Sequence, residues 1–167
     1  NGMGGGVSSL SKVCVISPSD RPDTDVDYRF FQLSSQNRVV DSSASCGNMA
    51  AAVGPFAVDE GLVSVNGDRI CVRIFNVNTD RMIRSTFSLD EGTAAVNGDL
   101  CLPGVAGSGA PIHLEFENLG GGGTGKLLPT GRPTDELQTQ GAQFEVSMVE
   151  AGNPCVFVRA QDLGLAG

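Results

Sequence analysis

The sequence has few basic side chains: 11 Lys and Arg stand against 19 Asp and Glu, so the formal net charge at pH 7 is −8. This balance argues against binding to nucleic acid or to an anionic membrane surface, because both need a field of Lys and Arg. The sequence also has no apolar run near the roughly 20 residues of a membrane-spanning helix. We therefore expect a soluble globular protein.

Histidine is scarce too, since His113 is the only one, and no two cysteines form a CxxC pair. An odd number of widely spaced cysteines fits neither a disulfide framework nor a zinc site. We expect no metal ion and a cytoplasmic location. The five cysteines are Cys14, Cys46, Cys71, Cys101 and Cys155.

Short β-branched or alternating runs, separated by Gly, Asn, Asp and Pro, predict that most of the ordered chain forms strands. The predicted strands cover residues 12–16, 28–33, 37–41, 69–77, 83–89, 100–102, 112–116, 144–149 and 154–159.

One segment has a helical pattern, because apolar residues between Met49 and Ala57 recur at steps of three and four. The pattern predicts a helix that begins near Ser45 and ends near Gly61, with Pro55 kinking or splitting it. Many short strands with one apolar helix indicate an α+β fold, rather than a doubly wound sheet or a helical bundle.

The glycine-rich segment Gly120–Lys126 resembles a phosphate-binding loop at its glycine and lysine positions. Leu127 replaces the Ser or Thr that ligates Mg²⁺, and Pro129 blocks the helix that must follow such a loop. We interpret the segment as a hairpin loop.

Cys46 differs from the other four cysteines, which are predicted to lie in apolar strands as small hydrophobic residues. It stands where the predicted helix begins, and there the unpaired N–H groups and the helix dipole favour a thiolate or a bound carboxylate. Gly47 lets a carboxylate approach the backbone, and Asn48 offers a further donor. From the residues alone, a catalytic and a structural cysteine are equally compatible with this pattern.

The opening segment, residues 2–12, is the second candidate site, since it combines glycines, hydroxyls and one of the two lysines of the chain. This set suits a small anion, although composition alone favours a solvated loop before a strand. Its candidate ligand-binding residues are Gly5, Gly6, Ser8, Ser9, Ser11 and Lys12.

Five segments together resemble the PrpF family of isomerases and tautomerases of unsaturated carboxylates. They are GGGVSSLSKV (4–13), SCGNMAAAVGPFAVDEGLV (45–63), RIFNVNT (73–79), LLPTGRPTDEL (127–137) and EAGNPCVFV (150–158). The resemblance covers essentially the whole chain. It implies a diaminopimelate epimerase-like fold, in which a β-barrel-like mixed sheet wraps a central helix.

Family members have two such domains with the active site between them. The resemblance therefore implies that residues 1–167 form most of the first domain. The family's opening segment and the second domain, which completes the cleft, lie outside this chain. A homodimer is compatible with this organisation.

The resemblance also implies a 1,3-proton shift that moves a C=C bond in a di- or tricarboxylate of the aconitate, methylaconitate or oxalomesaconate type, without a cofactor. Lys12 and Cys46 match the family's catalytic lysine and cysteine. The expected substrate-binding residues are Gly5, Gly6, Ser8, Ser9, Ser11, Gly47, Asn48 and Met49. An amino-acid epimerase of the same fold and a non-catalytic carboxylate-binding protein remain the alternatives.

Overall fold

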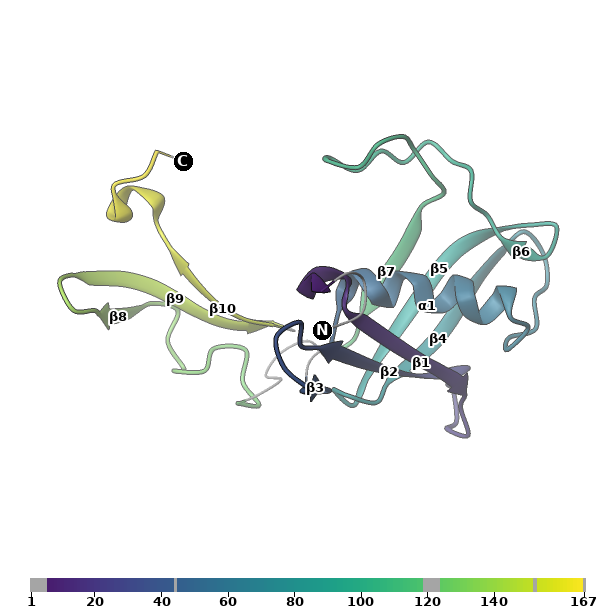
Figure 1. Ribbon diagram of the computed structural model, residues 1–167, viewed down its shortest axis with the longest axis horizontal. Coiled ribbons are helices and arrows are strands. Elements are labelled where there is room, and N and C mark those ends of the chain that lie inside the picture. Colours follow the sequence, from purple (N-terminus) through teal and green to yellow (C-terminus); the bar gives the residue numbers. More distant parts are fainter. Residues whose placement is uncertain (1–5, 44, 119–123, 152, 167) are drawn as a thin grey trace. The chain divides into compact units, whose positions relative to one another are not determined.

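The computed structural model describes residues 6–43, 45–118, 124–151 and 153–166 (Figure 1). The chain divides into two compact units, Asn1–Glu117 (unit 1) and Asn118–Gly167 (unit 2). The predicted grouping of residues 1–167 into most of one larger domain stays a prediction. Within the described residues, no helix is both long enough and apolar enough to cross a membrane.

Unit 1 is a mixed sheet with one helix. Its elements are the 3-10 turn η2 (Ser8–Leu10), β1 (Lys12–Pro18), β2 (Val26–Leu33), β3 (Val40–Asp41), α1 (Gly47–Asp59), β4 (Arg69–Asn76), β5 (Arg81–Asp90), β6 (Thr93–Ala94) and β7 (Ile112–Phe116). The strand order is β1-β2-β4-β5-β6, with β3 on β2 and β7 on β5. Only β2 and β4 pair in parallel; the other pairs are antiparallel. The predicted α+β class is therefore confirmed.

α1 lies across one face of this sheet, as Figure 1 shows, and the core forms between them. The alternation along β4 sends Val72 and Ile74 into the core, as their period of two predicts. Burial of apolar surface on this face supplies most of the stability of the unit. The buried core residues of unit 1 are Val26, Tyr28, Phe30, Ala50, Val53, Ala57, Val58, Val72, Ile74, Ile83 and Phe87.

The close approach of α1 to β5 depends on Gly54. A Cβ atom built at Gly54 would lie 2.6 Å from Ser85 Oγ and 2.9 Å from Phe87 Cε1, too near for any side chain. The helix runs through Pro55 without being split, contrary to one of the two expected outcomes. Gly61 ends it as predicted, with a φ of +68° that favours glycine.

Unit 2 is a three-stranded antiparallel sheet of order β10-β9-β8, followed by the 3-10 turn η3 (Ala160–Leu163). The strands are β8 (Asp135–Gln138), β9 (Gln143–Ala151) and β10 (Asn153–Val158). The sequence did not predict β8, because its residues are mostly polar. Asp135 begins this strand and accepts hydrogen bonds from Thr130 Oγ1 at 2.5 Å and Arg132 Nε at 2.8 Å, which fasten the preceding turn.

Three sequence predictions about the strands are wrong. Of the predicted strand 37–41, only Val40–Asp41 forms. Residues 100–102 do not form a strand, and Leu100 makes only an isolated bridge to Gly109. Cys71, Cys101 and Cys155 are exposed, so they are not the buried small hydrophobic residues expected of them. Sequence alternation alone could not reveal which strand faces stay uncovered. His113 is an exposed strand residue, as predicted.

Candidate active site

Lys12 and Cys46, which lie 34 positions apart, meet at one end of unit 1. Lys12 is the first residue of β1, and Cys46 is the N-cap residue of α1. The Lys12 ammonium donates a hydrogen bond to Cys46 Sγ, with 3.5 Å between Nζ and Sγ. An ammonium beside a thiol gives a pair that can exchange a proton with each other or with a third molecule. The structure therefore brings together the two residues that the family resemblance implies are catalytic.

The helix that starts at Cys46 has an open N-terminus. No side chain caps it among the described residues, and its first turn has no acidic residue. The first intrahelical bond runs from Ala50 N–H to the Cys46 carbonyl, at 2.9 Å, so the N–H groups of the residues between them have no place in the helical ladder. Gly47 and Asn48 are exposed, and a Cβ built at Gly47 meets nothing within 4 Å. These features suit a carboxylate lying beside the Cys46 thiol.

Behind this pair lies a second thiol, Cys14, that behaves as a structural residue. Burial raises the pKa of Cys14, and a hydrogen bond to Tyr28 and the nearby Lys12 only partly oppose this effect. The Cys14 thiol points to the Tyr28 hydroxyl, at 3.9 Å between Sγ and the oxygen. Burial likewise raises the pKa of Tyr28 far above its ordinary value, so its hydroxyl stays neutral beneath Cys46.

Residues 8–11, which precede Lys12, are held in place by hydrogen bonds from β2. Gln32 donates from Nε2 to the carbonyls of Ser8 and Ser11, at 2.9 and 3.0 Å. Ser11 is fully buried, and its hydroxyl donates to the Val7 carbonyl at 2.9 Å, so the geometry gives it a role within the segment. Its predicted contact with substrate stays a prediction.

The remaining predicted ligand-binding residues occupy varied positions. Ser8 and Ser9 are exposed in η2, and Gly6 has a φ of +77°. Met49 is partly buried and packs against the core of unit 1. Gly5 lies outside the described residues.

Three polar residues around this end of the sheet were not predicted from the sequence: Gln32, Asn76 and Asn78. Asn76 is 1% exposed at the end of β4, and its Nδ2 donates to Ser45 Oγ at 2.7 Å. The signal in the sequence that could have indicated them is the pair of asparagines in the RIFNVNT segment, which resembles the family.

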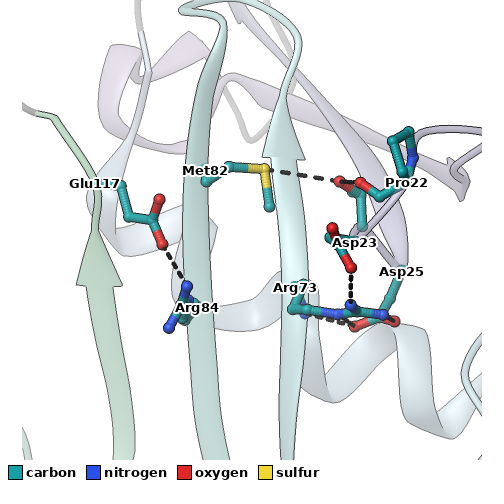
Figure 2. Close-up of polar contacts among 8 residues, drawn as sticks. Pro22, Asp23, Asp25, Arg73, Met82, Arg84 and Glu117 are labelled. Atoms are coloured by element: carbon teal, nitrogen blue, oxygen red, sulfur yellow. Dashed lines mark hydrogen bonds and ion pairs between the residues drawn. The ribbon is translucent and has the colours of Figure 1, made fainter.

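A hollow of about 540 Å³, separate from the Lys12–Cys46 pair, opens on unit 1 along β4 and β5 (Figure 2). Its two arginines are already paired: Arg73 Nη2 lies 2.7 Å from Asp25 Oδ1, and Arg84 Nη2 lies 2.9 Å from Glu117 Oε1. Burial disfavours ionisation of Asp25, but the hydrogen bonds from Arg73 outweigh it and lower the pKa of Asp25. The hollow is therefore lined by satisfied ion pairs that fasten the sheet, and it offers less chemistry than the Lys12–Cys46 pair.

The described part of the chain contains no group of three or more His, Cys, Asp or Glu side chains placed to hold a metal ion. The hairpin loop predicted at Gly120–Lys126 stays a prediction. Residues 119–123 lie outside the described residues, and no helix follows in residues 124–134.

Comparison with known proteins gives one consistent family. The model of the family described as PrpF protein matches residues 1–167. The whole chain is 45% identical to a putative isomerase, YraM, of Bacillus subtilis and 41% identical to the 3-methylitaconate isomerase of Eubacterium barkeri. It is 39% identical to the 2-methyl-aconitate isomerase of Cupriavidus necator. These matches cover 46%, 44% and 44% of the three relatives, so the chain spans less than half of their length.

Solved structures agree with the sequence comparison. The crystal structure of a methylitaconate-delta-isomerase superposes with a TM-score of 0.81 at 42% identity, over 96% of this chain and 42% of that one. A probable proline racemase from Agrobacterium radiobacter superposes with a TM-score of 0.57 at 14% identity, over 95% of this chain and 38% of that one. The second likeness shows a shared epimerase-like fold.

Proposed function

The chain belongs to the PrpF family, and on that premise we propose that it supplies one wall of the active site of an isomerase of unsaturated di- or tricarboxylates. The reaction is a 1,3-proton transfer that moves a C=C bond. The observation that carries this proposal is the contact between Lys12 Nζ and Cys46 Sγ, 3.5 Å apart at the start of α1. The relatives named as isomerases of methylitaconate and methylaconitate support the substrate class.

The proposed step needs three kinds of group. A base removes a proton from the carbon next to the C=C bond, and the electron pair of that C–H bond forms the new double bond. Charge then builds up on the conjugated carboxylate, where the N–H groups of Gly47 and Asn48 stabilise it. An acid returns a proton to the far carbon of the original double bond. Cys46 and Lys12 share the roles of base and acid, and either assignment leaves the atoms and charges balanced.

We also propose how the rest of the site is arranged. Ser8, Ser9, Gly5 and Gly6 line the substrate side of this wall, while Ser11 and Met49 support it from its buried side. A second domain outside this chain supplies the facing wall. In the complete protein the sheet of unit 1 wraps further around α1 as a barrel.

The proposed enzyme needs no cofactor, because side chains and backbone N–H groups can perform every part of the step. Its proposed location is the cytoplasm, which agrees with the free thiols of the exposed Cys71, Cys101 and Cys155. Activity that survives dialysis against a chelator is the expected result. Activity restored only by an added metal would contradict this part.

The test is an absorbance assay on the full-length protein with aconitate, methylaconitate and methylitaconate, at the wavelength of the conjugated enoate. Turnover of at least one substrate is expected. Replacing Lys12 by Ala should lower kcat by a factor on the order of 10² to 10⁴, the usual contribution of general acid–base catalysis. The matched control is Lys126→Ala, because Lys126 is the other lysine of the chain and is exposed in unit 2.

Other outcomes point to the alternative functions. Racemisation of an amino acid without movement of a double bond would favour the epimerase. Tight binding of aconitate without turnover would favour a carboxylate-binding protein that is not an enzyme. A Lys12→Ala protein with the full wild-type rate would rule out the acid–base pair.

A further inference from the structure

The segment between β3 and α1 ends at Cys46, and two asparagines of the NVN sequence hold it from the end of β4. Asn76 is the last residue of β4, and Asn78 follows two positions later. Neither has a part in the proposed proton transfer. Their hydrogen bonds nevertheless converge on residues shortly before the thiol.

The side-chain amide of Asn78 pairs with the backbone of Phe30 in β2, as the backbone of a neighbouring strand would. β2 and β4 pair in parallel as far as Tyr28 and Asn76, and beyond that point the Asn78 amide continues the pairing with Phe30. It accepts from Phe30 N–H at 2.7 Å and donates to the Phe30 carbonyl at 2.8 Å. Its Nδ2 also donates to the Ser42 carbonyl, at 2.6 Å. One side chain thus ties the segment before Cys46 to the centre of the sheet.

Asn76 holds the same segment three residues further on. Its Nδ2 donates to Ser45 Oγ at 2.7 Å, and its Oδ1 accepts from Asn78 N–H at 3.0 Å. The two asparagines are therefore hydrogen-bonded to each other, and each is also hydrogen-bonded to one serine, Asn76 to Ser45 and Asn78 to Ser42. A buried amide that loses its partner is costly, so Asn76, at 1% exposure, strongly favours the arrangement in which Ser45 stays bound.

This anchoring acts together with one further contact at the helix start, the hydrogen bond between the Cys46 backbone and Tyr28. The N-cap residue of α1 is Cys46, whose side chain makes no capping hydrogen bond. The Cys46 thiol instead contacts Lys12, the first residue of β1. The distance between Sγ and Nζ therefore depends on how firmly the preceding residues are fixed to the sheet.

We propose that Asn76 and Asn78 are positioning residues that set the Cys46 thiol against the Lys12 ammonium by holding Ser42 and Ser45. The inference rests on the proposed function for its effect on turnover, but the geometry can be tested without substrate. o-Phthalaldehyde condenses with one primary amine and one thiol that lie close together, losing two water molecules, and gives a fluorescent isoindole. Fluorescence that is lost in both Lys12→Ala and Cys46→Ser reports the Lys12–Cys46 distance.

The variants remove side-chain hydrogen bonds in the full-length protein. Asn78→Asp keeps the shape and the acceptor for Phe30 N–H but loses both bonds that Nδ2 donates, to the Phe30 and Ser42 carbonyls. Ser45→Ala removes the hydroxyl that Asn76 binds and leaves the sheet intact. The matched control is Asn97→Asp, the same chemical change at an exposed loop residue. Circular dichroism confirms that each variant is folded.

Asn78→Asp and Ser45→Ala should each slow isoindole formation at least about fivefold, the effect of losing one net hydrogen bond, while Asn97→Asp leaves it unchanged. In the isomerase assay their kcat should fall by a similar factor or more with little change in KM, because the N–H groups of α1 remain in place. The double variant Asn76→Leu/Ser45→Ala should be no worse than Asn76→Leu, since both remove the same contact.

Wild-type isoindole rates in folded Asn78→Asp and Ser45→Ala would overturn the proposal, as would equal losses in Asn97→Asp. A wild-type protein that forms the isoindole but turns over none of the carboxylates would instead count against the proposed function. In that case a slower reaction in the two variants would still support the positioning role.

Discussion

The packing of α1 on β5 predicts that Gly54→Ala destabilises the protein, although the same change usually stabilises a helix. An alanine in a helix interior is favoured over glycine by about 1 kcal/mol. Here the new Cβ would lie 2.6 Å from Ser85 Oγ and 2.9 Å from Phe87 Cε1, both on β5. Their side chains are buried, Ser85 at 0% and Phe87 at 3% exposure, so neither can swing into solvent. Overpacking of this kind costs up to about 3 kcal/mol, which leaves a net loss of about 2 kcal/mol.

The assay is hydrogen exchange of α1 in the full-length protein, measured by mass spectrometry. A loss of about 2 kcal/mol makes exchange through opening of the helix roughly 30-fold faster. Gly141→Ala is the control, because a Cβ there meets nothing within 4 Å. Adding Ser85→Ala should recover part of the loss, since it removes the nearest atom. Exchange in Gly54→Ala as slow as in the wild type would refute the close packing of α1 on β5.

Two further predictions follow from the pKa shifts. The lowered pKa of Asp25 means that its bond to Arg73 stabilises the fold above the ordinary value of 3.8 and that this stability is lost as the pH falls through the lowered pKa. Asp25→Asn should therefore make the urea midpoint depend less steeply on pH between about pH 5 and pH 2; an unchanged slope would contradict this. The raised pKa and partial burial of Cys14 predict that iodoacetamide labels it at least about tenfold more slowly than the exposed Cys71 at pH 8. Equal labelling, resolved by mass spectrometry of the peptides, would contradict that burial.

The sequence predicted the central helix and the main strands of unit 1 because their patterns are local. The step of two along β4 and the steps of three and four along α1 follow directly from backbone geometry. The signal that ends α1, a glycine at position 61, is equally local in the sequence. β8 was missed because a strand with mostly polar residues has no alternation to detect, and its turn is fixed by Asp135 rather than by apolar packing.

The site was predicted only in part, for a related reason. Lys12 and Cys46 were found through family likeness and the chemistry of a helix start, and the structure brings them together. The tasks of Gln32 and Asn78 could not be inferred, because each acts on backbone groups of segments distant in the sequence. Exposure of Cys71 likewise depends on which sheet face α1 leaves uncovered, which is a property of the tertiary fold.

The most direct test of the central claim is isomerisation of methylaconitate or aconitate by the full-length protein in D₂O, followed by ¹H NMR. The wild-type protein is expected to move the double bond and to place deuterium at the newly protonated carbon. Lys12→Ala and Cys46→Ser should both lose this reaction, while Lys126→Ala keeps it. Double-bond movement at the wild-type rate in either Lys12→Ala or Cys46→Ser would contradict the claim that this pair carries the proton.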